Sequence, residues 1–219
     1  MRFKVSPLLI VNEIFYSIQG ESTHAGRPCV FVRLAYCNLR CSYCDTAYAF
    51  NEGSGKNVEE VLSEIRRYSA HLVEVTGGEP LMQPDVHPLM TALCDLGYEV
   101  LLETGGSLDI EPVDGRVKRI VDFKCPSSGM AKKNLWRNAG LLRSGDEVKF
   151  VIGTREDFDW AVERVREHHL PERVTVLFSP VFGELEPRLL AGWILSLDLP
   201  IRMQLQMHKY IWEPTARGV

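Results

Sequence analysis

The chain has 219 residues, of which 45% are apolar, and this suits one domain with a sizeable core rather than a disordered chain. Lys and Arg number 25 and Asp and Glu 29, so the formal net charge is −4, which makes a nucleic-acid-binding protein a poor candidate. No stretch approaches the about 18 apolar residues of a membrane span, and residues 1–4 do not lead into a signal-peptide core. We therefore expect a single domain over residues 1–219, located in the cytoplasm.

Apolar runs of strand length recur along the whole chain after an extended lead-in at residues 8–15. The predicted strands span residues 29–36, 72–75, 98–102, 117–123, 147–152 and 174–178, with a further candidate at 201–205. A polar, glycine-punctuated loop is expected between residues 17 and 27.

Helical patterns alternate with these strands. Residues 57–68 carry an apolar stripe behind Asn57 and Glu60, which form a capping-box pattern, and Thr154 and Asp157 precede a second such stripe. Further helices are expected near residues 86–93, 135–142 and 189–197. Alternating strands and helices predict a parallel sheet with right-handed crossovers. Six or so units are too few for a closed eight-stranded barrel, so we expect an α/β fold with a partial, open (β/α)6-type barrel.

Three cysteines, Cys37, Cys41 and Cys44, lie at C-x3-C-x2-C spacing in one short loop after the first buried strand. Thiolates hold iron–sulfur clusters, and closely spaced cysteines in an intracellular chain more often bind metal than form disulfides. The loop has no fourth cysteine, so a four-iron cluster would keep one iron open to a small molecule. The alternative is a zinc site completed by a histidine such as His24, although zinc cysteines usually come as two separated C-x2-C pairs.

This loop, with Tyr43 just before its last cysteine, resembles the radical S-adenosylmethionine (radical SAM) superfamily. Together with residues 15–21 and 31–34 upstream and Asp45-Thr46 downstream, it is similar to the 7-carboxy-7-deazaguanine synthase family of the queuosine pathway. One departure is Ser22, where many relatives have glycine. The resemblance implies a lyase that converts 6-carboxy-5,6,7,8-tetrahydropterin to 7-carboxy-7-deazaguanine with loss of ammonia. It also implies a 4Fe-4S cluster, S-adenosyl-L-methionine that yields a 5′-deoxyadenosyl radical, and Mg²⁺.

A Thr-Gly-Gly-Glu-Pro segment, residues 76–80, follows the second buried strand. Its glycines let the backbone approach a ligand closely, and Glu79 offers an anion for an ammonium group. Alone such a segment is usually a turn, but beside the cysteine loop it resembles the GGEP motif that binds S-adenosylmethionine. Segments after the third, fourth and sixth strands face the same sheet edge, although each could be an ordinary loop, and Tyr43 could be a packing aromatic. The resemblance implies the cofactor-binding residues Tyr43, Cys44, Asp45, Gly78, Glu79, Glu103, Cys125, Pro126, Ser127 and Ser179.

The substrate-binding residues are predicted mainly in the block before the first buried strand. Gln19 and Glu21 pair an amide with a carboxylate, which suits the mixed donors and acceptors of a pterin edge. Arg33 can bind a carboxylate through two N–H groups. By resemblance Thr46 is a magnesium ligand, although it could instead cap a turn, and a lone histidine such as His208 is more often structural. The full predicted set is Ile18, Gln19, Gly20, Glu21, Arg33, Thr76 and His208.

Two other functions are compatible with the cysteine spacing. One is a glycyl-radical activating enzyme, which Gln19-Gly20-Glu21 joined to Asp45-Thr46 argues against; the other is a non-enzymatic iron–sulfur or zinc module. The resemblance also implies a flavodoxin- or ferredoxin-type reductant and a homodimer.

Overall fold

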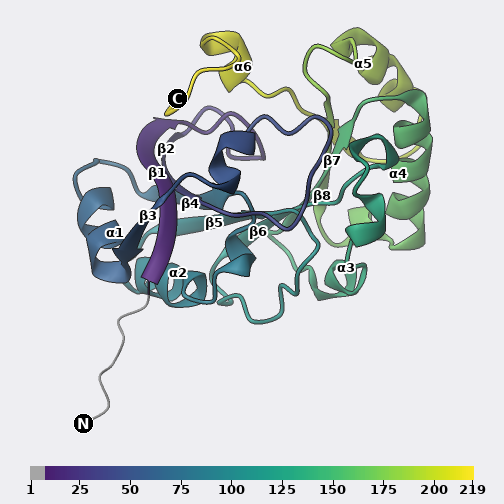
Figure 1. The fold of residues 1–219 in the computed structure, drawn as a ribbon. Helices are drawn as coiled ribbons and strands as arrows, with labels where there is room; N and C mark the ends of the chain where they lie inside the picture. Colours follow the sequence, from purple (N-terminus) through teal and green to yellow (C-terminus); the bar gives the residue numbers. More distant parts are fainter. Residues whose placement is uncertain (1–7) are drawn as a thin grey trace.

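A single nine-stranded sheet organises residues 8–219, the part of the chain that the computed structural model describes (Figure 1). The strand order across the sheet is β3-β1-β2-β4-β5-β6-β7-β8-β9. The strands are β1 (Leu8–Ile18), β2 (Pro28–Leu34), β3 (Ser54–Asn57), β4 (Leu72–Gly77), β5 (Glu99–Thr104), β6 (Lys118–Asp122), β7 (Glu147–Ile152), β8 (Thr175–Pro180) and β9 (Ile201–Met203). The expectation about residues 1–4 lies outside the described residues.

Helices cover one side of this sheet, and a short helix lies beyond its edge (Figure 1). They are α1 (Val58–Ile65), α2 (Val86–Asp95), α3 (Arg137–Leu141), α4 (Arg155–Glu167), α5 (Pro187–Leu195) and α6 (His208–Ile211). Within residues 8–219, none is long and apolar enough to cross a membrane.

The strands from β2 to β9 all run parallel, whereas β1 is antiparallel to both β2 and β3. The terminal strands β3 and β9 do not pair with each other, so the sheet stays open. This confirms the predicted α/β fold with a partial barrel. Parallel strands gather their carboxyl ends at one edge, and the loops that follow them meet there.

The two faces of the sheet differ in chemistry. Valines of β2, β4 and β5 join the main core against the helices. The opposite, inner face carries a separate apolar cluster, which we call the apolar floor: Phe15, Cys29, Phe31, Leu72, Leu101 and Ile120. Because side chains alternate along a strand, the residues two positions after Phe31, Leu101 and Ile120 face the same side. These are Arg33, Glu103 and Asp122, so a charged layer lies above the apolar floor toward the carboxyl edge.

Both predicted capping boxes are present. The Asn57 side chain accepts from the Glu60 backbone N–H at 2.9 Å, and the Glu60 carboxylate accepts from the Asn57 N–H at 2.7 Å. Thr154 and Asp157 form the same reciprocal pair at the start of α4. Each box satisfies N–H groups that a helix start leaves unpaired.

The structure differs from the sequence-based expectations at three places. The lead-in is an eleven-residue strand, β1, that includes the first two residues of the expected loop, and its edge pairs with the polar strand β3, which the sequence did not indicate. The predicted alternation of strands and helices is wrong between β5 and β6, because the segment that connects these two strands contains no helix. There the buried side chain of Asn138 holds the connection, donating to Leu108 O at 2.7 Å and accepting from Ile110 N at 3.3 Å.

Replacing Thr154 by alanine removes the acceptor for the Asp157 N–H, 3.1 Å away. We expect the free energy of unfolding to fall by about 1 kcal/mol, the usual effect of losing such a cap. Anaerobic urea denaturation followed by tryptophan fluorescence measures this. Thr154→Ser keeps the hydroxyl and serves as the control, and equal losses in both variants would contradict the capping role.

Candidate active site

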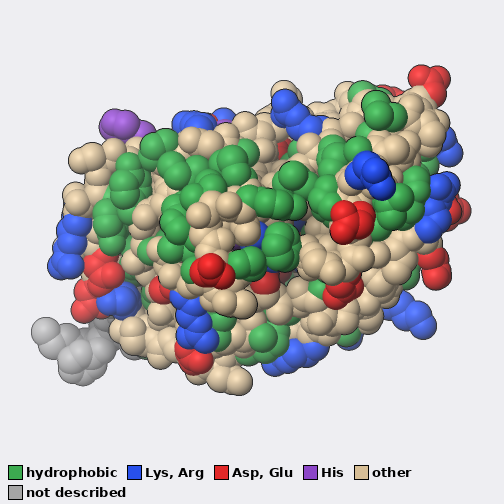
Figure 2. Space-filling view, turned by 90° about the horizontal axis from the view of Figure 1, so that it is seen from above, with side chains coloured by type: hydrophobic (Ala, Val, Ile, Leu, Met, Phe, Trp, Pro, Cys, Tyr) green, Lys and Arg blue, Asp and Glu red, His purple; other side chains and the backbone are tan. Residues whose placement is uncertain are grey.

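A cavity of about 710 Å³ opens at the carboxyl edge of the sheet, above the charged layer. Viewed from above, hydrophobic side chains surround a hollow in which charged groups are visible (Figure 2). Fifteen of the predicted site residues line it. They are Ile18, Gln19, Gly20, Glu21, Arg33, Cys37, Cys41, Tyr43, Cys44, Asp45, Thr46, Thr76, Gly78, Glu103 and His208.

The cysteine loop is attached to the ends of neighbouring strands. Tyr36, just before it, has a positive φ of 71°, and its carbonyl accepts from the Glu79 N–H at 2.8 Å. Ser42 donates through its backbone N–H to Ser128 O at 3.1 Å and through its hydroxyl to Ser127 O at 2.9 Å. These bonds fix the loop between the segments that follow β4 and β6.

The three loop thiols fit an iron–sulfur cluster. They are free and half-buried, and burial raises the pKa of Cys37 and Cys41, with the charge of Lys124 opposing that rise at Cys41. Among residues 8–219, no three His, Cys, Asp or Glu side chains are grouped closely enough to hold a single metal ion. Three separated thiols on one cavity wall therefore suit a multi-iron cluster better than one zinc ion.

His24 is not available as a fourth ligand in that loop. Its Nδ1 lies 2.6 Å from Arg27 Nη1 and 3.8 Å from Glu99, the first residue of β5. It thus sits toward the amino ends of the strands, whereas the cysteines are at the carboxyl edge. The zinc site considered from the sequence is not supported.

The two glycines of residues 76–80 permit a close backbone contact. Gly77 has φ +132°, and a Cβ on Gly78 would lie 2.0 Å from Tyr36 O. Any side chain at either position would push the strand end away from the start of the cysteine loop.

Glu79 is fully buried and does not line the cavity. Its carboxylate accepts from Leu81 N at 3.1 Å, from Thr104 Oγ1 at 2.8 Å and from Gly105 N at 2.7 Å. Burial raises its pKa, and these hydrogen bonds oppose the rise. Glu79 therefore ties the end of β4 to the end of β5, and its predicted contact with a cofactor stays a prediction.

The other predicted cofactor residues outside the cavity wall are Cys125, Pro126, Ser127 and Ser179. Ser127 donates its backbone N–H to Asp157 Oδ1 at 2.9 Å. The Ser179 hydroxyl is buried, and the described residues offer it no partner. Such an unpaired group is consistent with contact to a ligand, and the cofactor contacts of these four residues stay predictions.

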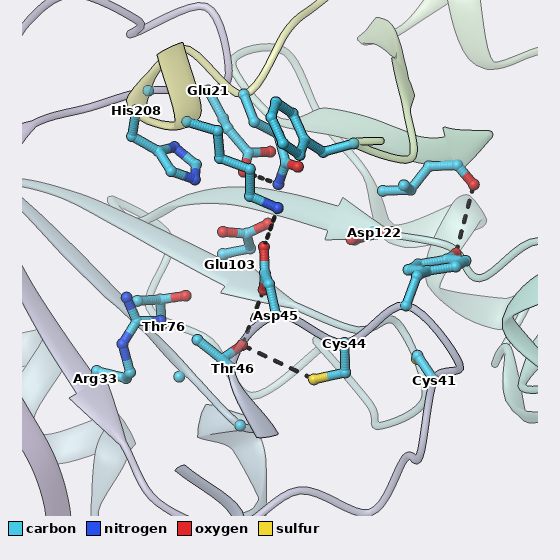
Figure 3. A pocket seen from close by; sticks show the side chains of 18 of the residues that line it. Glu21, Arg33, Cys41, Cys44, Asp45, Thr46, Thr76, Glu103, Asp122 and His208 are labelled. Atoms are coloured by element: carbon cyan, nitrogen blue, oxygen red, sulfur yellow. Dashed lines mark hydrogen bonds and ion pairs between the residues drawn. The ribbon is translucent and has the colours of Figure 1, made fainter. Parts of the chain in front are cut away.

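Figure 3 shows Glu21 and His208 facing Cys41 and Cys44 across the cavity, whereas Arg33 and Thr76, which are paired on β2 and β4, lie beside Thr46. Glu21 accepts from the amides of Gln204 and Gln206, each at 3.0 Å. Burial works to raise its pKa, but the charges of Lys149 and His208 and the hydrogen bonds from Lys149 and Gln206 together lower it. Glu21 is therefore held as a carboxylate.

Arg33 and His208 are also positioned by named contacts. Arg33 Nε donates to Glu13 at 2.7 Å, and no residue of 8–219 pairs with its terminal nitrogens. Burial lowers the pKa of His208, which favours the neutral imidazole. A Cβ on Gly20 would lie 2.4 Å from His208 Nδ1, so the absence of a side chain at Gly20 lets the histidine approach.

Several charged residues of the cavity were not predicted from the sequence. Lys149, on the inner face of β7, forms ion pairs with Glu21 at 2.8 Å, with Asp122 at 3.5 Å and with Glu103. Lys124 pairs with Asp122 at 2.9 Å. Burial works to lower the pKa of Lys149, but the carboxylates outweigh it and raise that pKa well above the ordinary value. The sequence feature that could have identified Lys149 is its position as a lysine within a predicted apolar strand.

Glu74 was missed as well. It is buried in the cavity wall and accepts a hydrogen bond from the amide of Gln19. Burial, followed by the charges of Glu103 and Glu21, raises its pKa well above the ordinary value. The cavity therefore contains a carboxyl group that favours its protonated form.

Ser22, the departure from the family pattern, has a φ of 63°. This is the left-handed region that favours glycine. Its hydroxyl accepts from His24 N at 3.0 Å, and its own N–H donates to Gln204 at 2.6 Å. These bonds hold the serine in a conformation that glycine would adopt freely.

Comparisons with known proteins agree on one family. Residues 32–187 match the family model of the Radical SAM superfamily. A 7-carboxy-7-deazaguanine synthase from Chlorobaculum tepidum is 50% identical over 214 residues, which cover 96% of this chain and 97% of that protein. Another from Koribacter versatilis is 42% identical over 224 residues, covering 95% and 99%.

Solved structures share the fold. QueE from Escherichia coli superimposes with a TM-score of 0.76 at 23% identity, covering 92% of this chain and 95% of that one. SuiB from Streptococcus suis, crystallised with S-adenosylmethionine, gives a TM-score of 0.54 at 13% identity over 78% of this chain and 45% of its own. At these identities the likeness concerns the fold alone.

Glu79→Gln tests whether Glu79 is a structural anchor. An amide NH₂ would face N–H or O–H donors, so we expect a loss of about 1–3 kcal/mol in unfolding free energy with little change in S-adenosylmethionine affinity. Denaturation and equilibrium dialysis measure the two. A tenfold loss of affinity at unchanged stability would instead favour direct cofactor contact.

Gly20→Ala places a Cβ against His208 and should displace the imidazole from the cavity wall. A misplacement of about 1 Å costs up to about 100-fold in rate, so we expect kcat/KM to fall by about 10- to 100-fold while the iron content stays constant. Gly192→Ala, where a Cβ meets nothing within 4 Å, is the matched control. Equal kinetics in both variants would show that Gly20 does not position His208.

Proposed function

Because the chain belongs to the 7-carboxy-7-deazaguanine synthase family of the radical SAM superfamily, we propose that it converts 6-carboxy-5,6,7,8-tetrahydropterin to 7-carboxy-7-deazaguanine. The reaction contracts the pterin ring with loss of ammonia, and its product belongs to queuosine biosynthesis. The observation that carries this is 50% identity to a named synthase over nearly the whole of both chains. The relatives' names do not favour a glycyl-radical activating enzyme.

A 4Fe-4S cluster and S-adenosylmethionine are the cofactors of this superfamily, and together they supply a 5′-deoxyadenosyl radical for hydrogen transfer at C6 of the substrate. Cys37, Cys41 and Cys44 would hold the cluster, since all three line the cavity on one loop. Asp122 and Lys124 lie beside that loop, and Asp122 Oδ1 is buried with no partner among the described residues. The remaining cofactor contacts are proposed for Tyr43, Asp45, Gly78, Glu103, Cys125, Pro126, Ser127 and Ser179, and Glu79 would support them through the strand ends that it joins.

The substrate would lie between Glu21 and His208 on one side of the cavity and Arg33 and Thr76 on the other. Arg33, whose Nε is held by Glu13, can offer its terminal N–H groups to the substrate carboxylate. Gln19 and Glu21 supply an amide and a carboxylate for the guanidine-like edge of the pterin. Ile18, Gly20, Thr76 and His208 complete the proposed set of substrate-binding residues. The neutral imidazole of His208 can donate a hydrogen bond at one nitrogen and accept at the other.

A magnesium ion is proposed at Thr46. Its hydroxyl lies 3.3 Å from Asp45 Oδ1 and faces the cavity. Magnesium prefers oxygen ligands and keeps several waters, so one protein hydroxyl and a substrate carboxylate suffice to place it between protein and substrate. Lys209 holds Asp45 at 2.7 Å on the same side.

The enzyme acts on a small molecule and needs an electron donor. We propose a flavodoxin- or ferredoxin-type reductant, a homodimer, and work in the cytoplasm, where the six free cysteines would stay reduced.

The central test uses anaerobic protein reconstituted with iron and sulfide, then supplied with reductant, S-adenosylmethionine, Mg²⁺ and the tetrahydropterin. We expect the deazapurine by chromatography and a cluster signal in electron paramagnetic resonance that changes when S-adenosylmethionine is added. Cys41→Ala should abolish both product and cluster, because two thiols cannot hold the same cluster.

Cys94→Ala, on α2 and away from the cavity, is the matched control and should keep full activity. Unchanged substrate recovered from a preparation that cleaves S-adenosylmethionine would contradict the proposed reaction.

A further inference from the structure

One buried lysine connects two sides of the cavity. We call the side with Glu21 and His208 the substrate wall, and the side with the cysteine loop and the ends of β5 and β6 the cofactor wall. The side chain of Lys149 is 4% exposed and pairs with Glu21, Glu103 and Asp122. These carboxylates come from three different places in the chain: the loop after β1, the end of β5 and the end of β6. A single ammonium group therefore sets the positions of three carboxylates that all line the cavity.

Glu21 belongs to the substrate wall. It shares that wall with Gly20, whose carbonyl accepts from Met207 N at 3.0 Å, and with Gln206, which donates to the Glu21 carboxylate. Its other oxygen accepts from Lys149.

Asp122 and Glu103 belong to the cofactor wall. Asp122 is bound by Lys124, whose charge acts on Cys41 of the cysteine loop. Glu103 directly precedes Thr104, which donates to Glu79 and so joins β5 to β4. Lys149 is thus the described residue that contacts carboxylates of both walls.

Stability alone does not account for this arrangement. Burying an ion pair costs desolvation that its attraction often fails to offset, and apolar replacements of such pairs are frequently neutral or stabilising. A lysine ringed by three carboxylates is therefore weak evidence for a stabilising role. It does impose a geometry, because in a low-dielectric interior the carboxylates are held toward the shared cation.

We propose that Lys149 is a positioning residue that fixes the substrate-binding carboxylate Glu21 relative to the cofactor-side carboxylates Glu103 and Asp122. The inference rests on the proposed function, since it concerns how closely cleavage of S-adenosylmethionine is coupled to substrate turnover. Radical transfer requires the donor carbon and the substrate C6 at near-contact distance. If one wall can move relative to the other, S-adenosylmethionine should still bind at its site. Its cleavage should then proceed without formation of the deazapurine.

The test compares the reconstituted parent with Lys149→Met and Lys149→Arg. In Lys149→Met we expect the ratio of released 5′-deoxyadenosine to deazapurine to rise by about tenfold or more, and KM for the tetrahydropterin to rise by a similar factor. Fluorescence titration with 6-carboxypterin, an oxidised relative of the substrate, should show a matching loss of affinity without any turnover. Lys149→Arg keeps the positive charge with a different shape, so its values should lie between parent and Lys149→Met.

Lys118→Met is the matched control, since Lys118 pairs with Glu99 at the amino ends of the strands and does not line the cavity. It should leave coupling and affinity unchanged, with iron content and thermal unfolding recorded for every variant. If Lys149→Met fails to fold, Lys149→Arg decides: raised uncoupling supports the proposal and a parental ratio overturns it. Parental coupling and affinity in a folded Lys149→Met also overturn it.

The two hypotheses fail in different ways. A parent enzyme that makes no deazapurine refutes the proposed reaction whatever the variants do. An active, well-coupled parent with equally well-coupled Lys149 variants leaves the reaction standing and refutes only the positioning role.

Discussion

Charge compensation inside the open barrel is the constraint on which the site depends. The charged layer of the cavity includes four carboxyl groups, Glu21, Glu74, Glu103 and Asp122, and two buried lysines, Lys149 and Lys124, face them. The apolar floor lies beneath this layer and keeps water away from one side of it. In such surroundings electrostatic interactions are stronger than in water. The position of each charged group therefore depends on its charged neighbours, and the charged layer must be considered as one unit.

The site is built where the strand ends meet. The cysteine loop is bonded to the segments after β4 and β6, and Glu79 joins β4 to β5 by accepting from Thr104 and Gly105. These contacts involve backbone groups as much as side chains. The sheet thus supplies a rigid base, while the loops that would meet the ligands are held at several points each. Rigid support of this kind is what a reaction through a free radical requires, because a poorly placed radical finds other partners.

Local patterns could be predicted from the sequence because their causes are local. The caps at Asn57 and Thr154, the buried strands and the spacing of the three cysteines each depend on residues a few positions apart. Strand β3 could not be foreseen, since its polar sequence becomes a strand only through pairing with β1. Lys149 was likewise missed because its three partners come from distant segments. The contacts of Glu79 with Thr104 and Gly105 depend on the register between β4 and β5. A short sequence motif gives no information about that register.

The loop of residues 19–27 meets the segment after β9, through Ser22 to Gln204 at 2.6 Å and Met207 to the Gly20 carbonyl at 3.0 Å. More than 180 residues separate these partners in the chain. On the ribosome, the central strands and their helices can fold as they emerge, whereas this closure must wait until nearly all of the polypeptide has been synthesised. A nascent chain therefore carries its cysteine loop before the segment after β9 can close this side of the cavity, so the two sides of the cavity take shape at different stages of synthesis.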